Sequence, residues 1–102
     1  MFAAANIRQF HPGSQVTVFE KKQQLLTKVR VSGGGRCNLS HACRDIAELL
    51  TAYPRGATLL KRVFHQFDHQ QTMEWFKERG LKLVMQDDGC VFPASQDAMS
   101  VV

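Results

Sequence analysis

Long apolar runs, cysteines and any excess of negative charge are missing or scarce in this sequence of 102 residues. The longest unbroken apolar run, Met1–Ala5, is far shorter than the roughly 20 residues that a membrane-spanning helix needs. No basic stretch precedes a longer apolar one at the start, so the sequence predicts neither a membrane association nor a secretory signal peptide. Three cysteines form an odd and sparse set, which argues against a secreted disulfide scaffold and predicts a reducing, cytoplasmic setting.

Positive charge is present, and it is unevenly distributed. The net charge is +4. Residues 21–62 hold nine basic side chains against two acidic ones, a net charge of +7, whereas residues 63–102 hold three basic against six acidic, a net charge of −3. A local positive field suits an anionic partner such as a phosphate group or a nucleic acid, and a solvated basic surface is the plainer interpretation of the charge alone.

The first third of the chain predicts a helix followed by a strand. Alanine-rich residues 2–10 favour a helix, which Pro12-Gly13 ends. β-Branched residues predict a strand over Val16–Glu20. Residues 23–30 are ambiguous between helix and extended chain, and the glycines at 33–35 must form a loop.

The rest of the chain predicts three helices, a hairpin and a final element. Asp45 with Glu48 and Asp68 with Gln71 are capping-box pairs that start the first and third helices. Pro54 ends the first helix, an amphipathic pattern over 57–67 marks the second, and Gly80 ends the third. Two short strands flank an Asp88-Gly89 turn, and Ser95 is the expected cap of a further element in which the chain stops. Both ends of the chain therefore look cut.

Glu20 occupies a position that suits a nucleotide. A helix, a turn and a strand that ends in an acidic residue make the second half of a βαβ nucleotide-binding unit. In that unit the acidic residue bonds a ribose hydroxyl about 20 residues after a glycine-rich turn. That turn and its strand would lie upstream of Met1, and an ordinary surface glutamate is the alternative.

Three consecutive glycines within "RVSGGGRCNLSH", Arg30–His41, form the most unusual stretch. Glycine reaches positive φ without strain and lets other groups approach the backbone, so the run predicts either a flexible loop or a cradle for an anion or a planar cofactor. Arg36 could pair with a phosphate. The run is not a Walker A loop, because Arg36-Cys37 stand where that motif needs Lys-Ser/Thr, and it opens no obvious helix.

Other reactive side chains have plainer interpretations. Cys37 is expected to be a small buried residue rather than a nucleophile. The C-x3-H-x-C spacing of Cys37, His41 and Cys43 fits no standard zinc site. His65 and His69 are four residues apart, but Asp68 is expected to start a helix between them, which disfavours a metal pair. Trp75 and Phe76 are expected to be core residues.

The segment "SGGGRCNLSHAC", Ser32–Cys43, resembles the signature of the BaiN/RdsA-type NAD(P)/FAD-dependent oxidoreductases. Four further stretches match that family in order: "VTVFEKK", "YPRG", "MEWFKERGLKL" and "DGCVFP". The resemblance covers nearly the whole chain. It implies an α/β fold: a partial FAD-binding, Rossmann-like domain of the two-dinucleotide type over residues 1–102, truncated at both ends.

The resemblance also implies a function. It implies a fragment of a flavin-dependent oxidoreductase that binds FAD, takes electrons from NAD(P)H and acts on a small-molecule substrate. It implies that Glu20 meets the adenosine ribose and that the segment 28–38 lies along the FAD. The expected cofactor-binding residues are Glu20, Lys21, Lys28, Ser32, Gly33, Gly34, Gly35, Arg36, Cys37 and Asn38. No catalytic acid or base and no metal ligand is assigned.

The sequence departs from the family's pattern in three places. The opening strand with its G-x-G-x-x-[GA] turn is absent, and so is the later part with the substrate domain. Cys90 stands where relatives often carry arginine in "DGRVFP". The first two departures predict that the chain alone is inactive.

Two other functions stay open at this stage. A small basic nucleic-acid-binding protein would explain the charge between residues 21 and 62, although no nucleic-acid motif is present. A non-catalytic remnant would explain the cut ends. In that case the edge of Val16–Glu20 would be unpaired and its apolar face uncovered.

Overall fold

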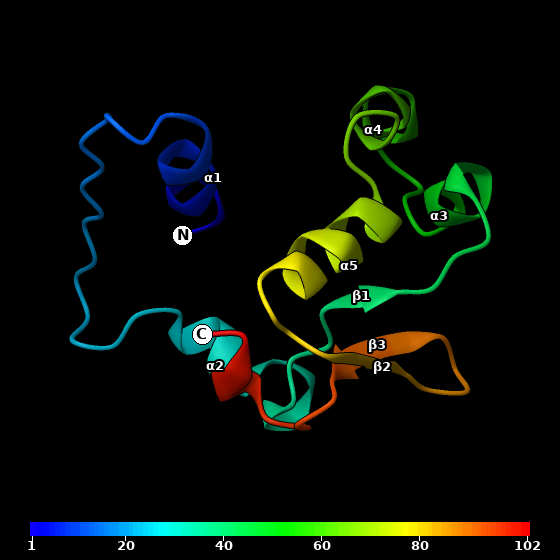
Figure 1. Ribbon diagram of the computed structural model, residues 1–102. Coiled ribbons are helices and arrows are strands. Elements are labelled where there is room, and N and C mark those ends of the chain that lie inside the picture. Colours follow the sequence, from blue (N-terminus) through cyan, green and yellow to red (C-terminus); the bar gives the residue numbers. More distant parts are fainter.

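In the computed structural model, which describes residues 1–102, the chain begins with helix α1, Phe2–Phe10, as predicted (Figure 1). Its alanines favour the helical backbone, and the helix ends at His11, next to Pro12. The Arg8 guanidinium then holds the following turn, because its Nη1 donates to the carbonyls of Pro12, at 3.0 Å, and Ser14, at 3.1 Å.

Helix α1 packs against α5, which spans His69–Glu78. The ring of Phe2 lies 4.6 Å from that of Trp75 and 5.5 Å from that of Phe67. Trp75 Nε1 donates to Asn6 Oδ1 at 3.0 Å, so the indole packs and also satisfies its one donor. Trp75 and Phe76, which were expected to be core residues, are partly buried and lie outside the buried core.

The strand predicted for Val16–Glu20 does not form, and that prediction is wrong. Residues 15–20 are neither helix nor strand and run down the outside of the molecule as a long open trace (Figure 1). A strand exists only where a neighbour accepts and donates its backbone hydrogen bonds, and residues 15–25 make no backbone–backbone hydrogen bond. β-Branched residues alone therefore do not create the strand.

Two short helices follow the glycine turn, and the start signal of the first was predicted. Helix α3 spans Ile46–Thr51 and α4 spans Ala57–Phe64. The Asp45 carboxylate caps α3 by accepting from the Glu48 amide at 2.8 Å. The Glu48 carboxylate accepts from the Arg44 amide rather than from that of Asp45, so the box is displaced by one residue.

Helix α5 carries the complete capping box that the sequence predicts. Asp68 accepts from the amides of Gln70 and Gln71, and the Gln71 side chain accepts from the Asp68 amide at 2.7 Å. At the other end Arg79 is the C-cap and Gly80 follows with φ +85°. Both predicted ends of α5 are confirmed.

The sheet has three strands in the order β1-β3-β2, all antiparallel. β2, Leu83–Met85, and β3, Cys90–Pro93, form the predicted hairpin, with Val84 opposite Phe92. β1, Ser40–His41, was not predicted, because two residues are too short for a periodic pattern. It follows the glycine turn directly and pairs Ser40 with Val91 and His41 with Cys90.

Three elements complete the chain around this sheet. Helix α2, Thr27–Val31, makes the second half of the ambiguous stretch 23–30 helical, whereas residues 23–26 form bends and a turn. The turn η1, Ser32–Gly35, follows α2. The turn η2, Ala98–Ser100, lies near the C-terminus and packs against α2. The predicted cap Ser95 is wrong: Asp97 is the cap, because its carboxylate accepts from the Met99 amide at 2.8 Å.

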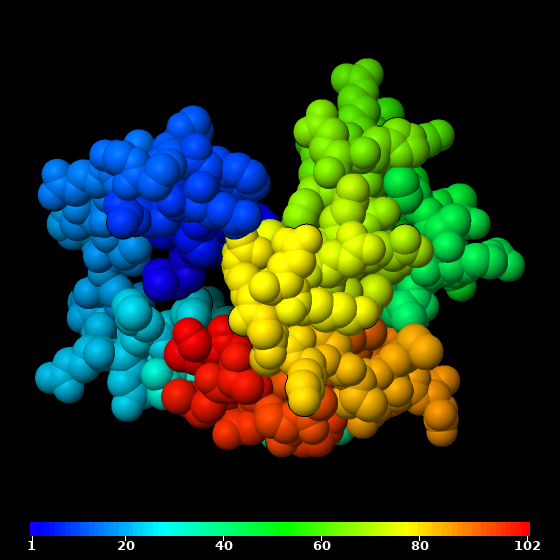
Figure 2. Space-filling view, in the orientation of Figure 1, coloured from blue at the N-terminus to red at the C-terminus, as the bar shows by residue number.

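The core is small and centred on β3. Only seven residues are buried, and the largest fully buried side chains are Val91 and Pro93 of this strand. Figure 2 shows the first residues of the chain (blue) standing apart from the sheet (orange) and touching the rest of the molecule beside α5 (yellow). The α/β class predicted from the sequence is confirmed, and no helix is both long and apolar enough to cross a membrane.

Candidate functional site: the glycine turn

The glycine turn joins α2 to β1, and its backbone conformation depends on glycine. Gly33, Gly34 and Gly35 have φ values of +56°, +66° and +86°. Residues with a Cβ rarely have positive φ at three consecutive positions, because the left-handed region costs each of them free energy. The loop predicted for residues 33–35 is thus a defined turn rather than a flexible linker.

The three glycines face different surroundings. A Cβ on Gly33 would lie 2.5 Å from the Asn38 amide nitrogen and 3.1 Å from Cε1 of Phe92, so this glycine packs tightly against β3. A Cβ on Gly34 would meet nothing within 4 Å, and one on Gly35 would meet only the Arg30 carbonyl, at 4.0 Å. One side of the turn is therefore closed by the protein and the other is open.

The turn presents successive backbone N–H groups. The Arg36 and Cys37 amides close it by donating to the Gly33 carbonyl, at 3.3 Å, and to the Ser32 carbonyl, at 2.9 Å. Successive N–H groups in a left-handed turn form a concavity that binds anions. The local backbone therefore has the chemistry of an anion cradle.

Arg36 is held beside this cradle by two residues from the other end of the chain. Its guanidinium lies 4.2 Å from the centre of the Phe92 ring, and its Nη1 donates to Gln96 Oε1 at 3.4 Å. Its Nε donates to the Gly33 carbonyl at 3.4 Å. Stacking and hydrogen bonding together restrict a side chain that is otherwise flexible.

Ser32 and Cys37 close the turn from inside. Ser32 Oγ donates to the Val29 carbonyl at 2.8 Å and so ties the turn to α2. Cys37 is buried and adopts φ +61°, which is unusual for a residue with a side chain. The interpretation of Cys37 as a small buried residue is confirmed.

Asn38 connects the turn to the hairpin. Its Nδ2 lies 3.4 Å from Cys90 Sγ and donates to it. The adjacent Asp88 carboxylate accepts from the Cys90 amide at 2.9 Å, and this hydrogen bond lowers the pKa of Asp88. The residue that replaces the family's arginine is thus a hydrogen-bond acceptor for a predicted site residue.

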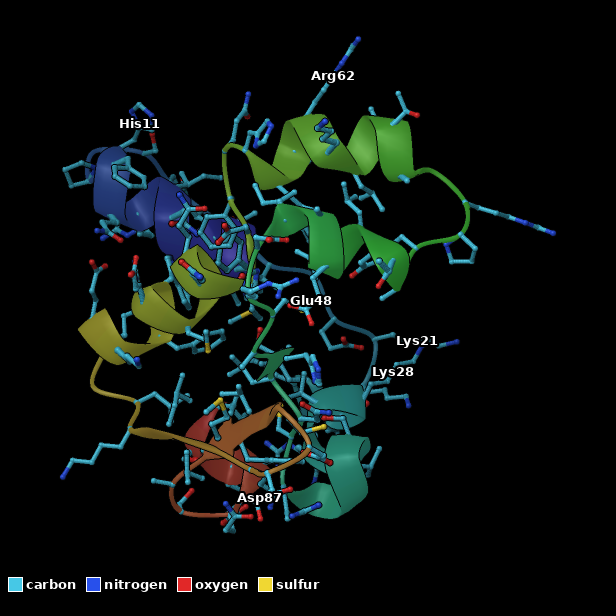
Figure 3. All side chains as sticks on the ribbon, turned by 90° about the vertical axis from the view of Figure 1, so that its right-hand side faces the viewer. His11, Lys21, Lys28, Glu48, Arg62 and Asp87 are labelled. Carbon is cyan, nitrogen blue, oxygen red and sulfur yellow. The ribbon has the colours of Figure 1, made fainter.

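The remaining predicted residues lie away from the turn itself. Lys28 is on α2, and Lys21 directly follows the open trace of residues 15–20. Both side chains project outward from the same edge of the molecule (Figure 3). Glu20 is exposed, and its carboxylate accepts from the Lys22 amide at 2.8 Å. The structure therefore gathers Ser32–Asn38 in one turn, whereas the roles of Glu20, Lys21 and Lys28 stay predictions.

Sequence reasoning missed Phe92 and Gln96 as parts of this site. Both act through Arg36, and Phe92 also packs on Gly33. The segment "DGCVFP" was a signal that could have identified Phe92, since it matches the family together with the glycine run. No local pattern marks Gln96.

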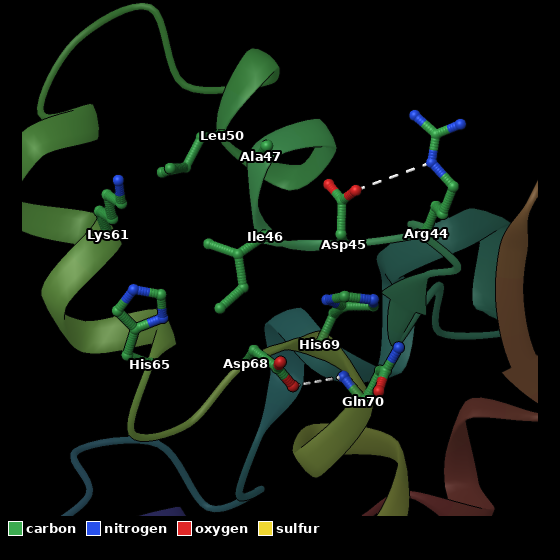
Figure 4. A pocket seen from close by; sticks show the side chains of 10 residues that line it. All are labelled: Arg44, Asp45, Ile46, Ala47, Leu50, Lys61, His65, Asp68, His69 and Gln70. Atoms are coloured by element: carbon green, nitrogen blue, oxygen red, sulfur yellow. Dashed lines mark hydrogen bonds and ion pairs between the residues drawn. The ribbon is translucent and has the colours of Figure 1, made fainter.

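A pocket of about 510 Å³ lies between α3, α4 and the start of α5 (Figure 4). Its lining residues are Arg44, Asp45, Ile46, Ala47, Leu50, Lys61, His65, Asp68, His69 and Gln70. Buried His69 bonds the Cys43 carbonyl through Nε2 at 2.8 Å. A carbonyl only accepts, so Nε2 carries a proton, and Nδ1 is buried without a hydrogen-bond partner.

This pocket has a structural explanation. Asp68 lies between His65 and His69 as the cap of α5, as predicted, and no three His, Cys, Asp or Glu side chains gather as metal ligands anywhere in the chain. Burial, and after it the negative charges of Glu48 and Asp45, raise the pKa of the Cys43 thiol. The hydrogen bond from His69 to the Cys43 carbonyl holds α5 to the loop before α3.

Comparison with known proteins shows the family to which the chain belongs. The family model described as "HI0933-like protein Rossmann domain" matches residues 1–102. The chain is 32% identical over 89 residues to the 3-dehydro-bile acid delta(4,6)-reductase of Clostridium scindens. That alignment covers 87% of this chain and 21% of the relative, so the chain spans about a fifth of the relative's length.

The whole-length family match and this identity confirm the resemblance to the BaiN/RdsA-type flavoproteins: the chain belongs to the HI0933-like family and carries its Rossmann domain.

Proposed function

We propose that the chain supplies part of the FAD-binding site of a flavin-dependent oxidoreductase, with the glycine turn lying against the cofactor. The observation that carries this proposal is the half-open turn: three left-handed glycines, closed by Phe92 on one side and empty at Gly34 on the other. FAD combines an anionic pyrophosphate with planar rings, and a backbone turn without Cβ atoms on its open side fits either part. The residues present therefore fit the cofactor.

Each residue has a binding role in this proposal. Gly34 and Gly35 bring the backbone close to the cofactor, and the Gly33 and Gly34 amides donate to it. Arg36, which Phe92 and Gln96 hold in place, offsets negative charge. Lys28 and Lys21 add positive charge, Ser32, Cys37 and Asn38 shape the turn, and Glu20 accepts from a ribose hydroxyl.

The chemistry of the reaction belongs to the cofactor. FAD supplies hydride transfer when it is bound, with NAD(P)H as the proposed electron source. This chain's residues bind and orient the cofactor, and none of them is proposed as a catalytic acid or base. The relative is a reductase of a 3-dehydro bile acid, so the proposed substrate class is a small unsaturated molecule, handled by a full-length protein.

The test is a titration of FAD with the purified chain, followed by quenching of flavin fluorescence. We expect saturable quenching, weakened about tenfold or more by Gly34→Ala, because the new Cβ fills the open side and strains a left-handed residue. Gly13→Ala is the matched control, since Gly13 also faces open space but needs no positive φ. Absence of quenching, or equal loss in both variants, contradicts the proposal.

A further inference from the structure

The pocket between α3, α4 and α5 contains one polar atom that the fold leaves without a partner. His69 is only 7% exposed, and the Cys43 carbonyl occupies its Nε2 at 2.8 Å. Its Nδ1 is buried and has no hydrogen-bond partner. Buried polar atoms are nearly always hydrogen-bonded, so an unpartnered nitrogen in the lining of a pocket points to a ligand that supplies the missing partner.

The orientation of the His69 ring directs this nitrogen into the pocket. Figure 4 shows the ring edge-on, with one nitrogen on the side of Arg44 and the other on the side of Ile46. Cys43 adjoins Arg44 in the chain, so the nitrogen on that side is Nε2. Nδ1 therefore faces the space between α3 and α4.

Asp68 adds a second acceptor beside His69. Its Oδ1 accepts from the amides of Gln70, at 2.8 Å, and Gln71, at 3.0 Å. Its Oδ2 accepts no hydrogen bond within the chain, and Figure 4 shows this oxygen turned away from Gln70. A second proton on His69 would bury a positive charge that makes no hydrogen bond, so Nδ1 acts as an acceptor too. This end of the pocket fits a positively charged hydrogen-bond donor.

The side of the pocket formed by α4 has the opposite character. Lys61 lines it and takes part in no ion pair. His65, the C-cap of α4, lies next to Lys61 in the lining (Figure 4). An unpaired ammonium group at the rim fits a carboxylate.

The rest of the lining limits the size and charge of the ligand. A volume of about 510 Å³ suits a small molecule. Two aspartates in the lining balance one arginine and one lysine, which favours a ligand that carries both signs of charge. The apolar wall, which suits an aliphatic group, consists of Ile46, Ala47 and Leu50.

We propose that this pocket binds a free α-amino acid with an aliphatic side chain. The ammonium group of the amino acid donates to His69 Nδ1 and Asp68 Oδ2. Its carboxylate pairs with Lys61, and its side chain packs against Ile46 and Leu50. The site is separate from the glycine turn and needs no cofactor.

The test uses the complete 102-residue chain without flavin and L-leucine as the probe, followed by isothermal titration calorimetry. We expect saturable binding with a Kd of about 1 mM, because leucine is small and the pocket is open. N-acetyl-leucine lacks the ammonium group and leucinamide lacks the carboxylate. Each should bind about tenfold more weakly or less, because each leaves one end of the pocket unpaired.

Two chain variants with matched controls locate the site. Lys61→Glu should weaken leucine binding about fivefold, whereas Arg62→Glu, the same charge change at the next position of α4 but outside the lining, should change it less than about twofold. Asp68→Asn keeps a good helix cap but loses the charge, and should weaken binding about tenfold. Asp87→Asn is its control, and circular dichroism checks that α5 persists.

Nitrogen NMR of the His69 ring reports on the proposed contact itself. The Nδ1 resonance should move as leucine saturates the chain, while the Nε2 resonance stays in place because the Cys43 carbonyl still occupies it.

Four results would overturn the proposal. They are no binding at about 10 mM leucine, equal binding of leucine and either of its two derivatives, equal loss in the variants of Lys61 and Arg62, and a free chain in which both ring nitrogens of His69 carry protons. Because the flavin titration is a separate experiment, failure here leaves the cofactor proposal standing, and the reverse also holds.

Discussion

Gly33 is the residue on which the shape of the turn depends most. Its φ is positive, and an added Cβ would meet backbone at Asn38 and the Phe92 ring. We expect Gly33→Ala to lower the free energy of unfolding by about 2 kcal/mol, from backbone strain and overpacking together. Urea denaturation measures the loss.

Gly13→Ala is the control for this prediction. Nothing lies within 4 Å of a Cβ at Gly13, and its φ is not positive, so the free energy of unfolding should change by less than about 0.5 kcal/mol. Equal stability of the two variants would show that the turn tolerates a side chain at Gly33.

Asp88 makes the hairpin sensitive to acid. Hydrogen bonds from Cys90 lower its pKa in the folded chain, so its contribution to stability is complete above the ordinary aspartate pKa of about 3.9. That contribution is lost as the pH falls through the lower folded value. An NMR titration of the Asp88 carboxyl carbon should have a lower midpoint in the native chain than in urea.

Asp88→Asn tests the same hydrogen bond from the other side. An amide oxygen still accepts from the Cys90 amide but does not titrate. Hydrogen exchange of the Cys90 amide should therefore lose the part of its pH dependence that follows protonation of Asp88. An unchanged pH dependence in the variant would assign the effect to another group.

Single residues also show where sequence reasoning stops. The glycine run predicted an unusual backbone, because the ability to adopt positive φ without strain is a property of glycine itself. The partners of Arg36 were not predictable, because Gln96 lies 60 residues away and its amide side chain has no distinguishing pattern.

Helix α5 depends on its cap. Asp68→Ala removes the acceptor of two backbone amides and should lower the free energy of unfolding by about 1 kcal/mol. Asp87→Ala is the matched control, because that aspartate is exposed and caps nothing. Thermal denaturation followed by circular dichroism compares the two, and equal melting temperatures would contradict the role of the cap.

Elements made by local contacts were predictable, and elements made by distant ones were not. The caps of α5 and the Asp88-Gly89 hairpin need only residues a few positions apart. β1 exists only because β3, about 50 residues later, pairs with it. The error at Val16–Glu20 has the opposite origin. Its local pattern is typical of a strand, but no other strand of the chain pairs with it.

The molecule as a whole is expanded for its size. Its accessible surface is 7652 Å², whereas a folded protein of 11.5 kDa exposes about 5,800 Å². Its radius of gyration is 15.1 Å, against about 13 Å for a compact domain of this length. Much of the excess comes from α1 and the open trace of residues 15–20, which stand apart from the sheet (Figure 2).

This expansion should be visible in solution. We expect small-angle X-ray scattering to give a radius of gyration near 15 Å for the monomer. A value near 13 Å would mean that residues 15–20 fold back onto the sheet.

The contact between Arg36 and Gln96 also sets an order in time. The two residues are 60 positions apart, and ribosomes add roughly 5–20 residues per second, so the glycine turn waits roughly 3–12 s for its partner during synthesis. α5 and the hairpin rely on near neighbours and can form before it. The part of the chain proposed to hold the cofactor is therefore translated early and completed last, and a nascent chain paused before Phe92 would be unable to bind flavin.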